Sequence, residues 1–152
     1  MSEYTHEQMQ AILGKHAAWL RGEAQGVKAV FSGADLTSAY LKGADLRQAE
    51  LHGCDLTGAY LSEIDLESAT ISKCNLTNAV AKGARFQSAS MRYCNLTGAN
   101  CQGANFRSAN LQQANLTDAY LKDCDMDGIS GTGITWSDTF THGLHYRDAD
   151  IE

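Results

Sequence analysis

Few residues in this chain have the type and spacing that chemistry requires. His142 and His145 form an HxxH pair, the one metal-like spacing in the sequence, but no carboxylate or cysteine set lies at a matching distance. No nucleophile elbow, phosphate-binding loop or paired-carboxylate signature occurs. Catalysis also needs a pocket that shifts pKa values and excludes water. We therefore expect a protein that is not an enzyme and that has no catalytic residues, no cofactor and no metal.

The five cysteines raise the question of a metal site or of disulfides; they are Cys54, Cys74, Cys94, Cys101 and Cys124. The sequence contains no CxxC pair, and an odd number of cysteines without a secretion signal argues against a disulfide framework. All five fall on inward positions of the repeat described below. We interpret them as small apolar residues of the core.

Threonines recur every twenty residues, at Thr37, Thr57, Thr77, Thr97 and Thr117. Hydroxyls about 4.8 Å apart on a flat β-helix side could order water, which raises an ice-binding hypothesis. Only one rank of threonines is present and Asp or Asn flanks it, so the sequence disfavours that hypothesis. The Asn-Leu-Thr triplets that begin at Asn75, Asn95 and Asn115 match glycosylation acceptors, but we interpret them as by-products of the repeat.

A repeat of five residues positions all of these side chains, and it runs from Ala29 to Gly128 without insertion or deletion. Every fifth residue from Phe31 to Met126 is apolar, and the residue two positions before each of these is Ala or Cys except at Ile64. A period of five fits neither an α-helix nor a strand, so the chain must turn regularly. A fixed short period indicates a solenoid in which each unit stacks on the next. Because the threonines recur every twenty residues, we expect four pentapeptides to form one turn with four sides.

The pentapeptides ADLTS, ADLRQ, CDLTG, CNLTN, CNLTG, ANFRS and ANLTD resemble the consensus of the pentapeptide-repeat family, in which A, D or N, and L precede two variable residues. The resemblance covers roughly two-thirds of the chain. It implies an all-β solenoid, a right-handed quadrilateral parallel β-helix of about six coils, with Leu or Phe ladders inside and four flat outer faces. At the usual strand spacing, six coils would make a rod about 29 Å long.

Residues 1–28 do not obey the repeat. Thr5, with a glutamine three residues later, forms a capping-box pattern, and apolar residues at helical spacing predict a helix from Thr5 to Arg21. An uncovered first coil would present unpaired strand edges, so we expect this helix to be an N-terminal cap. The segment HAAWLRGEAQGVKA also resembles an N-terminal cap found in many members of the family. We interpret His16 and Trp19 as packing residues of this cap and not as a ligand site.

Residues 129–152 follow the five regular coils of residues 29–128, and here the consensus fades while the register survives. We interpret this segment as a degenerate last coil that closes the C-terminal end. This segment contains three bulky aromatic residues, Trp136, Phe140 and Tyr146. Two interpretations stay open, a homodimer contact through this end and a plug of a single monomer.

The charge of the chain is unevenly distributed. The formal net charge is −6, yet no Asp or Glu occurs between Ser68 and Thr117. The rod is thus predicted to be acidic at both ends, with a weakly basic middle. No apolar N-terminal segment follows Met1 and no run approaches the ~20 residues of a transmembrane helix, so we expect a cytoplasmic protein that does not contact membrane.

The family resemblance implies a binding protein, and its best understood members protect or inhibit DNA gyrase by imitating duplex DNA. The first hypothesis is therefore a bacterial DNA mimic that occupies the DNA-binding groove of gyrase, of another DNA-processing enzyme or of a nucleic-acid-targeting complex, without binding nucleic acid itself. The acidic residues proposed for this surface are Asp45, Asp65, Glu67, Asp125 and Asp127. Charge density argues against this hypothesis. Duplex DNA would carry roughly 17 charges over the length of the rod, whereas the net charge of the chain is −6.

The alternative hypothesis is a structural or adaptor module that presents flat faces to a protein partner. Tyr40, Tyr60 and Tyr120 lie near lysines and form the most interface-like strip, because exposed tyrosines are enriched in protein contacts. The competing interpretation is that these tyrosines only stiffen the sheet.

Overall fold

The computed structural model describes residues 4–145 and Arg147, and it begins with a single helix, α1 (His6–Leu20). The Thr5 hydroxyl accepts a hydrogen bond from the Gln8 N–H, and the Gln8 side chain accepts one from the Thr5 N–H. The predicted capping box is thus confirmed. Gly22, with φ of 72°, ends the helix, and its N–H donates to the Trp19 carbonyl while the Glu23 N–H donates to Ala18. These two bonds form a Schellman motif, for which glycine is the preferred residue.

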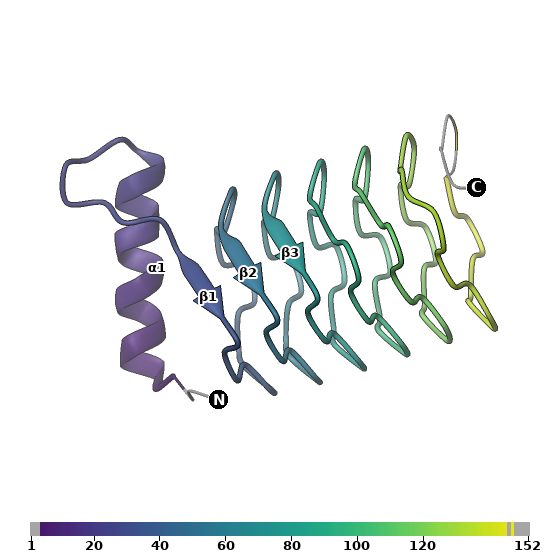
Figure 1. Cartoon of the computed structure of the whole chain (residues 1–152), viewed down its shortest axis with the longest axis horizontal. Coiled ribbons are helices and arrows are strands. Elements are labelled where there is room, and N and C mark those ends of the chain that lie inside the picture. Colours follow the sequence, from purple (N-terminus) through teal and green to yellow (C-terminus); the bar gives the residue numbers. More distant parts are fainter. Residues whose placement is uncertain (1–3, 146, 148–152) are drawn as a thin grey trace.

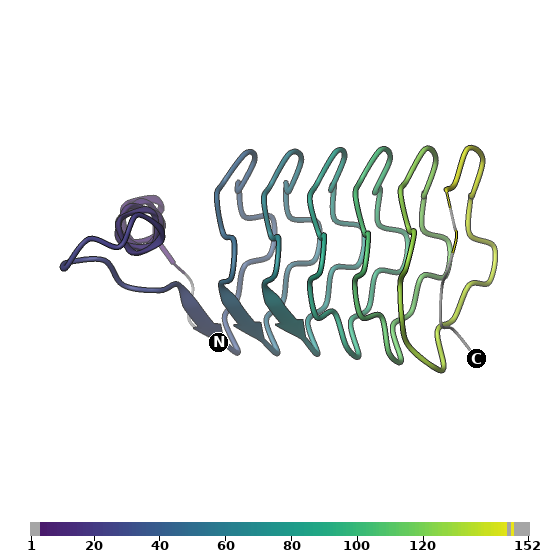
Figure 2. The ribbon, with the colours of Figure 1, turned by 90° about the horizontal axis from the view of Figure 1, so that it is seen from above.

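Beyond α1 the chain winds into coils of twenty residues. Three short strands, β1 (Val30–Ser32), β2 (Glu50–His52) and β3 (Thr70–Ser72), form a parallel sheet in the order β1-β2-β3. Their register pairs each residue with the one twenty positions later, as in Phe31 with Leu51. Isolated parallel bridges with the same shift continue to the pair Asp125 and His145. Figure 1 shows the coils following one another along the long axis, and Figure 2 shows the same stack from above with α1 beside its first coil. The repeat register predicted beyond Gly128 therefore persists through His145.

The corners of the coil are turns with one residue in the left-handed region. At a representative corner the Ala59 N–H donates to the Leu56 carbonyl at 3.0 Å, and Gly58 between them has φ of 63°. A positive φ at the third residue alone is the signature of a type II turn. Each pentapeptide therefore contributes one flat side and one corner, which is why a period of five produces a four-sided coil.

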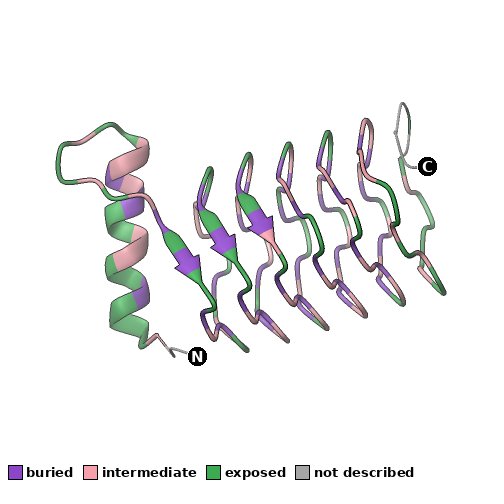
Figure 3. Cartoon of the chain, in the orientation of Figure 1, coloured by how far each residue is buried: buried purple, intermediate pink, exposed green. Residues whose placement is uncertain are grey.

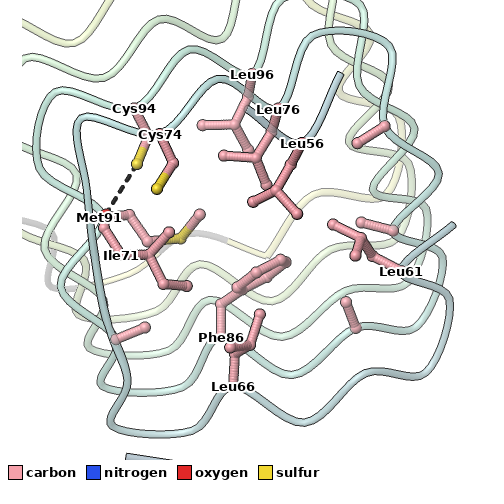
Figure 4. Close-up of a cluster of buried hydrophobic side chains, with 14 of the residues drawn as sticks. Leu56, Leu61, Leu66, Ile71, Cys74, Leu76, Phe86, Met91, Cys94 and Leu96 are labelled. Carbon is pink, nitrogen blue, oxygen red and sulfur yellow. Dashed lines mark hydrogen bonds between the residues drawn. The ribbon is translucent and has the colours of Figure 1, made fainter. Parts of the chain in front are cut away.

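The core is a column of the large inward residues. Every fifth residue from Phe31 to Met126 is buried, as the sequence predicts. Phe86 and Phe106 stack with ring centroids 4.9 Å apart, and Figure 4 shows leucines from successive coils lying above one another. In Figure 3 the central residue of each strand is buried, between neighbours that face outward. Ala39 and Ala44 are only half-buried because they lie in the first coil, at the end of the stack.

Helix α1 packs against the first coil. Met9 joins the core cluster, and Ile12 and Leu13 pack against it. His16 is the one polar side chain that is fully buried in the described residues. Toward the other end, Ile134, Trp136 and Leu144 are half-buried against the same core.

We number the four sides of the coil by the outward residues that the parallel pairings stack on one another. Side 1 carries Asp35, Asp55, Asn75, Asn95, Asn115 and Thr135; side 2 carries Tyr40, Tyr60, Val80, Asn100, Tyr120 and Phe140; side 3 carries Asp45, Asp65, Arg85, Asn105, Asp125 and His145; side 4 carries Val30, Glu50, Thr70, Ser90, Asn110 and Ser130. The residue two positions after each of these lies on the same side. Within the coils, only these outward positions and the corners are available to a partner.

Candidate interaction surfaces

Side 3 brings the predicted acidic residues together, but arginines pair with them. Arg47 Nη2 lies 2.7 Å from Asp45 Oδ2, and Arg47 Nε lies 3.9 Å from Asp65 Oδ2. Arg85 approaches Asp65 at 3.4 Å and Glu67 at 3.1 Å from the following coil. Hydrogen bonding from the Arg47 guanidinium lowers the pKa of Asp45 below its ordinary value. The charges of these carboxylates are therefore largely balanced by the neighbouring guanidinium groups.

The same pairing recurs toward the C-terminal end of side 3. Arg107 Nη1 lies 3.2 Å from Asp125 and 3.6 Å from Asp127 of the following coil. Arg147 is exposed on the same side. Side 3 thus carries five carboxylates and four guanidinium groups, which leaves a formal charge of −1. The structure gathers the predicted residues on one side, yet that side is not an acidic surface.

Side 1 uses its polar side chains within the coil stack. The Thr57 hydroxyl donates to Asp55 Oδ1 at 2.6 Å and accepts from Asn75 Nδ2 at 2.9 Å. Thr77 repeats this pattern, donating to Asn75 Oδ1 and accepting from Asn95 Nδ2. Because these hydroxyls already bond to side chains, they do not form the free rank that ordering of water would need.

Side 2 carries an interrupted ladder of aromatic side chains, in which Val80 and Asn100 separate the pair Tyr40 and Tyr60 from the pair Tyr120 and Phe140. Tyr40 and Tyr60 are 70% and 50% exposed, with ring centroids 6.2 Å apart. Tyr120 and Phe140 stack face to face at 4.6 Å with an interplanar angle of 5°, and Phe140 is 47% exposed. The tyrosines that the sequence analysis selected therefore share one side, and Phe140 extends their ladder.

Two of the residues predicted for a dimer contact, Trp136 and Phe140, do not share one surface. Trp136 is half-buried and packs against the core, whereas Phe140 points outward on side 2. Tyr146 lies outside the described residues. The structure thus separates Trp136 from Phe140, and Phe140 belongs with the side 2 ladder.

The pair His142 and His145 is divided by a corner. His145 stacks on Asp125 of side 3, whereas His142 follows Phe140 on side 2. Among residues 4–145 and Arg147, no group of three His, Cys, Asp or Glu side chains could hold a metal ion. Over the same residues, no helix has the length and apolar character needed to cross a bilayer.

Twenty-residue coils with one large and one small inward side chain per pentapeptide define a four-sided parallel β-helix solenoid. The family model described as pentapeptide repeats matches residues 27–62, 59–98 and 94–130, with eight copies, and the chain belongs to this family. Its members fold as right-handed quadrilateral β-helices, and they are generally non-catalytic structural or binding proteins.

Solved structures include similar folds at low sequence identity. Rfr23, a pentapeptide repeat protein of the cyanobacterium Cyanothece 51142, is 19% identical, with 95% of this chain and 99% of that chain covered and a TM-score of 0.53. A pentapeptide repeat protein of Nostoc PCC 7120 is 18% identical, with 94% of both chains covered and a TM-score of 0.49. QnrB1, a plasmid-mediated fluoroquinolone resistance protein, is 16% identical, with 81% of both chains covered and a TM-score of 0.44. The comparison with curated proteins finds no match. The likeness to Rfr23 supports the fold alone.

Proposed function

We propose that this chain is a non-catalytic adaptor that binds a protein partner through side 2. The observation that carries the proposal is the aromatic ladder of side 2, in which Tyr40, Tyr60 and Phe140 are exposed and Phe140 stacks on the half-buried Tyr120. Aromatic side chains are enriched at protein interfaces, and several of them on one flat side offer apolar area to a partner. The side chains of sides 1 and 3, in contrast, largely bond to one another.

The charge of side 2 specifies the chemistry of the partner. Lys42, Lys82 and Lys122 lie on the same side as the ladder, two coils apart from one another, and only Lys42 approaches a carboxylate of the described residues, at 3.6 Å from Glu63. Parallel strands about 4.8 Å apart space these lysines by roughly 10 Å. The partner that fits is a folded protein whose surface has apolar pockets flanked by carboxylates.

The charge of side 3 supports this adaptor function over imitation of DNA. A duplex of about 29 Å presents roughly 17 phosphates, whereas side 3 has a formal charge of −1. A gyrase groove that attracts phosphates would gain little from carboxylates that already pair with Arg47, Arg85 and Arg107.

Affinity capture with matched variants tests the proposal. The triple variant Tyr40→Ser, Tyr60→Ser, Phe140→Ser removes the three exposed members of the ladder, and the control Val27→Ser, Val30→Ser removes exposed apolar side chains elsewhere. We expect a partner captured from bacterial lysate by the wild type and the control to bind the triple variant at least tenfold more weakly by calorimetry, a loss of about 1.4 kcal/mol or more. Excess duplex DNA should leave capture unchanged. Equal binding by the folded triple variant, or competition by DNA, would overturn the proposal.

A further inference from the structure

A depression with a volume of about 350 Å³ opens on side 4, next to β3. Its lining consists of Thr70, Ser72, Lys73, Ser90, Arg92 and Tyr93. Four of these residues carry a hydroxyl, including the phenol of Tyr93, two carry a positive charge and none carries a carboxylate. The depression lies outside side 2, so it is independent of the surface proposed above.

Both cations of this depression stand without an ionic partner. Arg47, Arg85 and Arg107 each lie within 4.0 Å of a carboxylate, whereas neither Lys73 nor Arg92 forms an ion pair within residues 4–145 and Arg147. The sequence contains no Asp or Glu between Ser68 and Thr117. The depression is therefore locally positive, although the net charge of the whole chain is −6.

The backbone holds the cationic and aromatic residues of the site in an unfavourable conformation. Tyr93 has φ of 59° and Lys73 has φ of 56°, at a corner where Gly33 and Gly53 stand in the two preceding coils. Thirteen non-glycine residues at corners of the described chain have a positive φ, so this conformation belongs to the repeat. At Tyr93 the bulky side chain makes it energetically unfavourable. Tyr93 is 47% exposed, so burial in the core does not compensate for the strain.

Tyr93 also orients the arginine. The guanidinium carbon of Arg92 lies 5.7 Å from the centroid of the Tyr93 ring, within the range of a cation–π interaction. Arg92 is thereby placed beside Lys73 of the preceding coil, with the hydroxyls of Thr70 and Ser90 on the same lining. The Ser72 hydroxyl is engaged at 2.7 Å from His52 Nδ1.

We propose that this depression binds a phosphate monoester, carried either by a small molecule or by a phosphorylated side chain of a protein. A guanidinium fork matches two phosphate oxygens, and an ammonium adds a second positive charge. Two cations balance the dianion, and the nearby hydroxyls donate to its remaining oxygen. A single carboxylate would leave one cation of the site without a partner.

NMR titration of the intact ¹⁵N-labelled protein tests the proposal, with inorganic phosphate and a phosphoserine peptide as probes and chloride at equal ionic strength as reference. We expect saturable shifts at the amides of Lys73, Arg92 and Tyr93. The double variant Lys73→Gln, Arg92→Gln should bind phosphate at least tenfold more weakly, while Arg107→Gln binds as the wild type does. Binding of the peptide tenfold tighter than of inorganic phosphate assigns the group to a protein, and equal affinities assign it to a small molecule.

Replacing the strained tyrosine provides a second, independent measurement. Tyr93→Gly relieves the positive φ and removes the ring that orients Arg92, so its melting temperature should rise while phosphate binding weakens. The proposal is overturned if shifts follow ionic strength without saturating, or if the double variant and Arg107→Gln respond alike. It also fails if Tyr93→Gly binds phosphate as tightly as the wild type.

Discussion

The thiol of Cys94 donates a hydrogen bond of 2.9 Å to the carbonyl oxygen of Ile71, which lies 23 residues earlier in the adjoining coil (Figure 4). Ile71 is the central residue of β3, and the Cys74 N–H does not close the usual turn hydrogen bond to its carbonyl. The Ile71 N–H donates to Ser90 of the following coil, so its carbonyl faces that coil too, and no described backbone N–H of that coil donates to it. A buried cysteine is therefore the donor that satisfies a backbone acceptor inside the core.

This relationship predicts that Cys94→Ala destabilises the protein more than Cys124→Ala does. The Cys124 thiol donates in the same way to the Cys101 carbonyl, at 2.8 Å, but that carbonyl also accepts from the Ala104 N–H at 2.9 Å. Only the Cys94 variant leaves a buried carbonyl without a donor, which should cost about 1–3 kcal/mol. Urea unfolding monitored by circular dichroism measures both losses. Equal losses for the two variants would show that filling of volume, not the hydrogen bond, sets the effect.

The cysteines should be unreactive in the folded protein. All five are free and buried. Burial raises the pKa of Cys94 to about 12 and that of Cys124 to about 11, so these thiols hold little thiolate at neutral pH. Hydrogen bonding with Cys74 lowers the pKa of Cys54 to about 7, but Cys54 is only 1% exposed, so a reagent cannot reach it. We expect no rapid reaction with a chromogenic disulfide reagent in buffer and titration of all five thiols in guanidinium chloride. Rapid labelling in buffer would contradict the interpretation of these residues as core.

The fold was predictable because its determinants are local and repeated. The capping box at Thr5 and the inward column from Phe31 to Met126 depend on spacing along the chain, and the structure confirms both. The extended form of side 4, which is limited to β1, β2 and β3, carries no marker in the pentapeptide consensus. The extended form of this side depends on whether the following corner has a turn hydrogen bond, and the spacing of residues along the chain does not determine whether that bond forms.

The surfaces were less predictable because side chains from different coils combine there. Arg85 and Glu67 lie 18 residues apart, so the twenty-residue period places them on one side, but whether they pair depends on side-chain conformation. A count of acidic residues therefore overstated the charge of side 3. The depression around Arg92 and Tyr93 likewise depends on corner residues, and the period that places outward residues on the four sides does not predict where corner side chains point.

A charge placed in the inward column should unfold the rod. Leu76 is buried among leucines of the neighbouring coils, and Leu76→Lys would insert an ammonium where no acceptor is present (Figure 4). We expect a loss of more than about 4 kcal/mol, which prevents folding or divides the stack. Leu96→Lys should behave in the same way. The control Thr77→Lys changes the adjacent outward residue and should retain a cooperative transition; a melting temperature unchanged by Leu76→Lys would refute the inward assignment.

His16 should make the packing of α1 on the first coil dependent on pH. The Ala29 N–H donates to His16 Nδ1 at 3.0 Å, so the hydrogen of the neutral ring lies on Nε2, which donates to the Arg47 carbonyl at 3.0 Å. Protonation of Nδ1 would break the bond to Ala29. Burial is the main cause that lowers the pKa of His16 below 6.5; Lys28 and Arg47 lower it further, while the bond to Arg47 and the charge of Asp45 oppose the shift.

The direction of this dependence follows from proton binding in the two states. The unfolded chain protonates His16 near pH 6.5, whereas the folded chain does so only at lower pH, so the unfolded chain binds more protons in between. The contribution of His16 to stability is thus complete above about pH 6.5 and is lost as pH falls toward the lowered pKa. His16→Gln should cost about 1–3 kcal/mol at pH 7.5, since one buried group loses its partner. Its melting temperature should fall less than that of the wild type between pH 7.5 and 5. The other histidines remain in both proteins, so parallel pH profiles would show that His16 does not couple α1 to the coil.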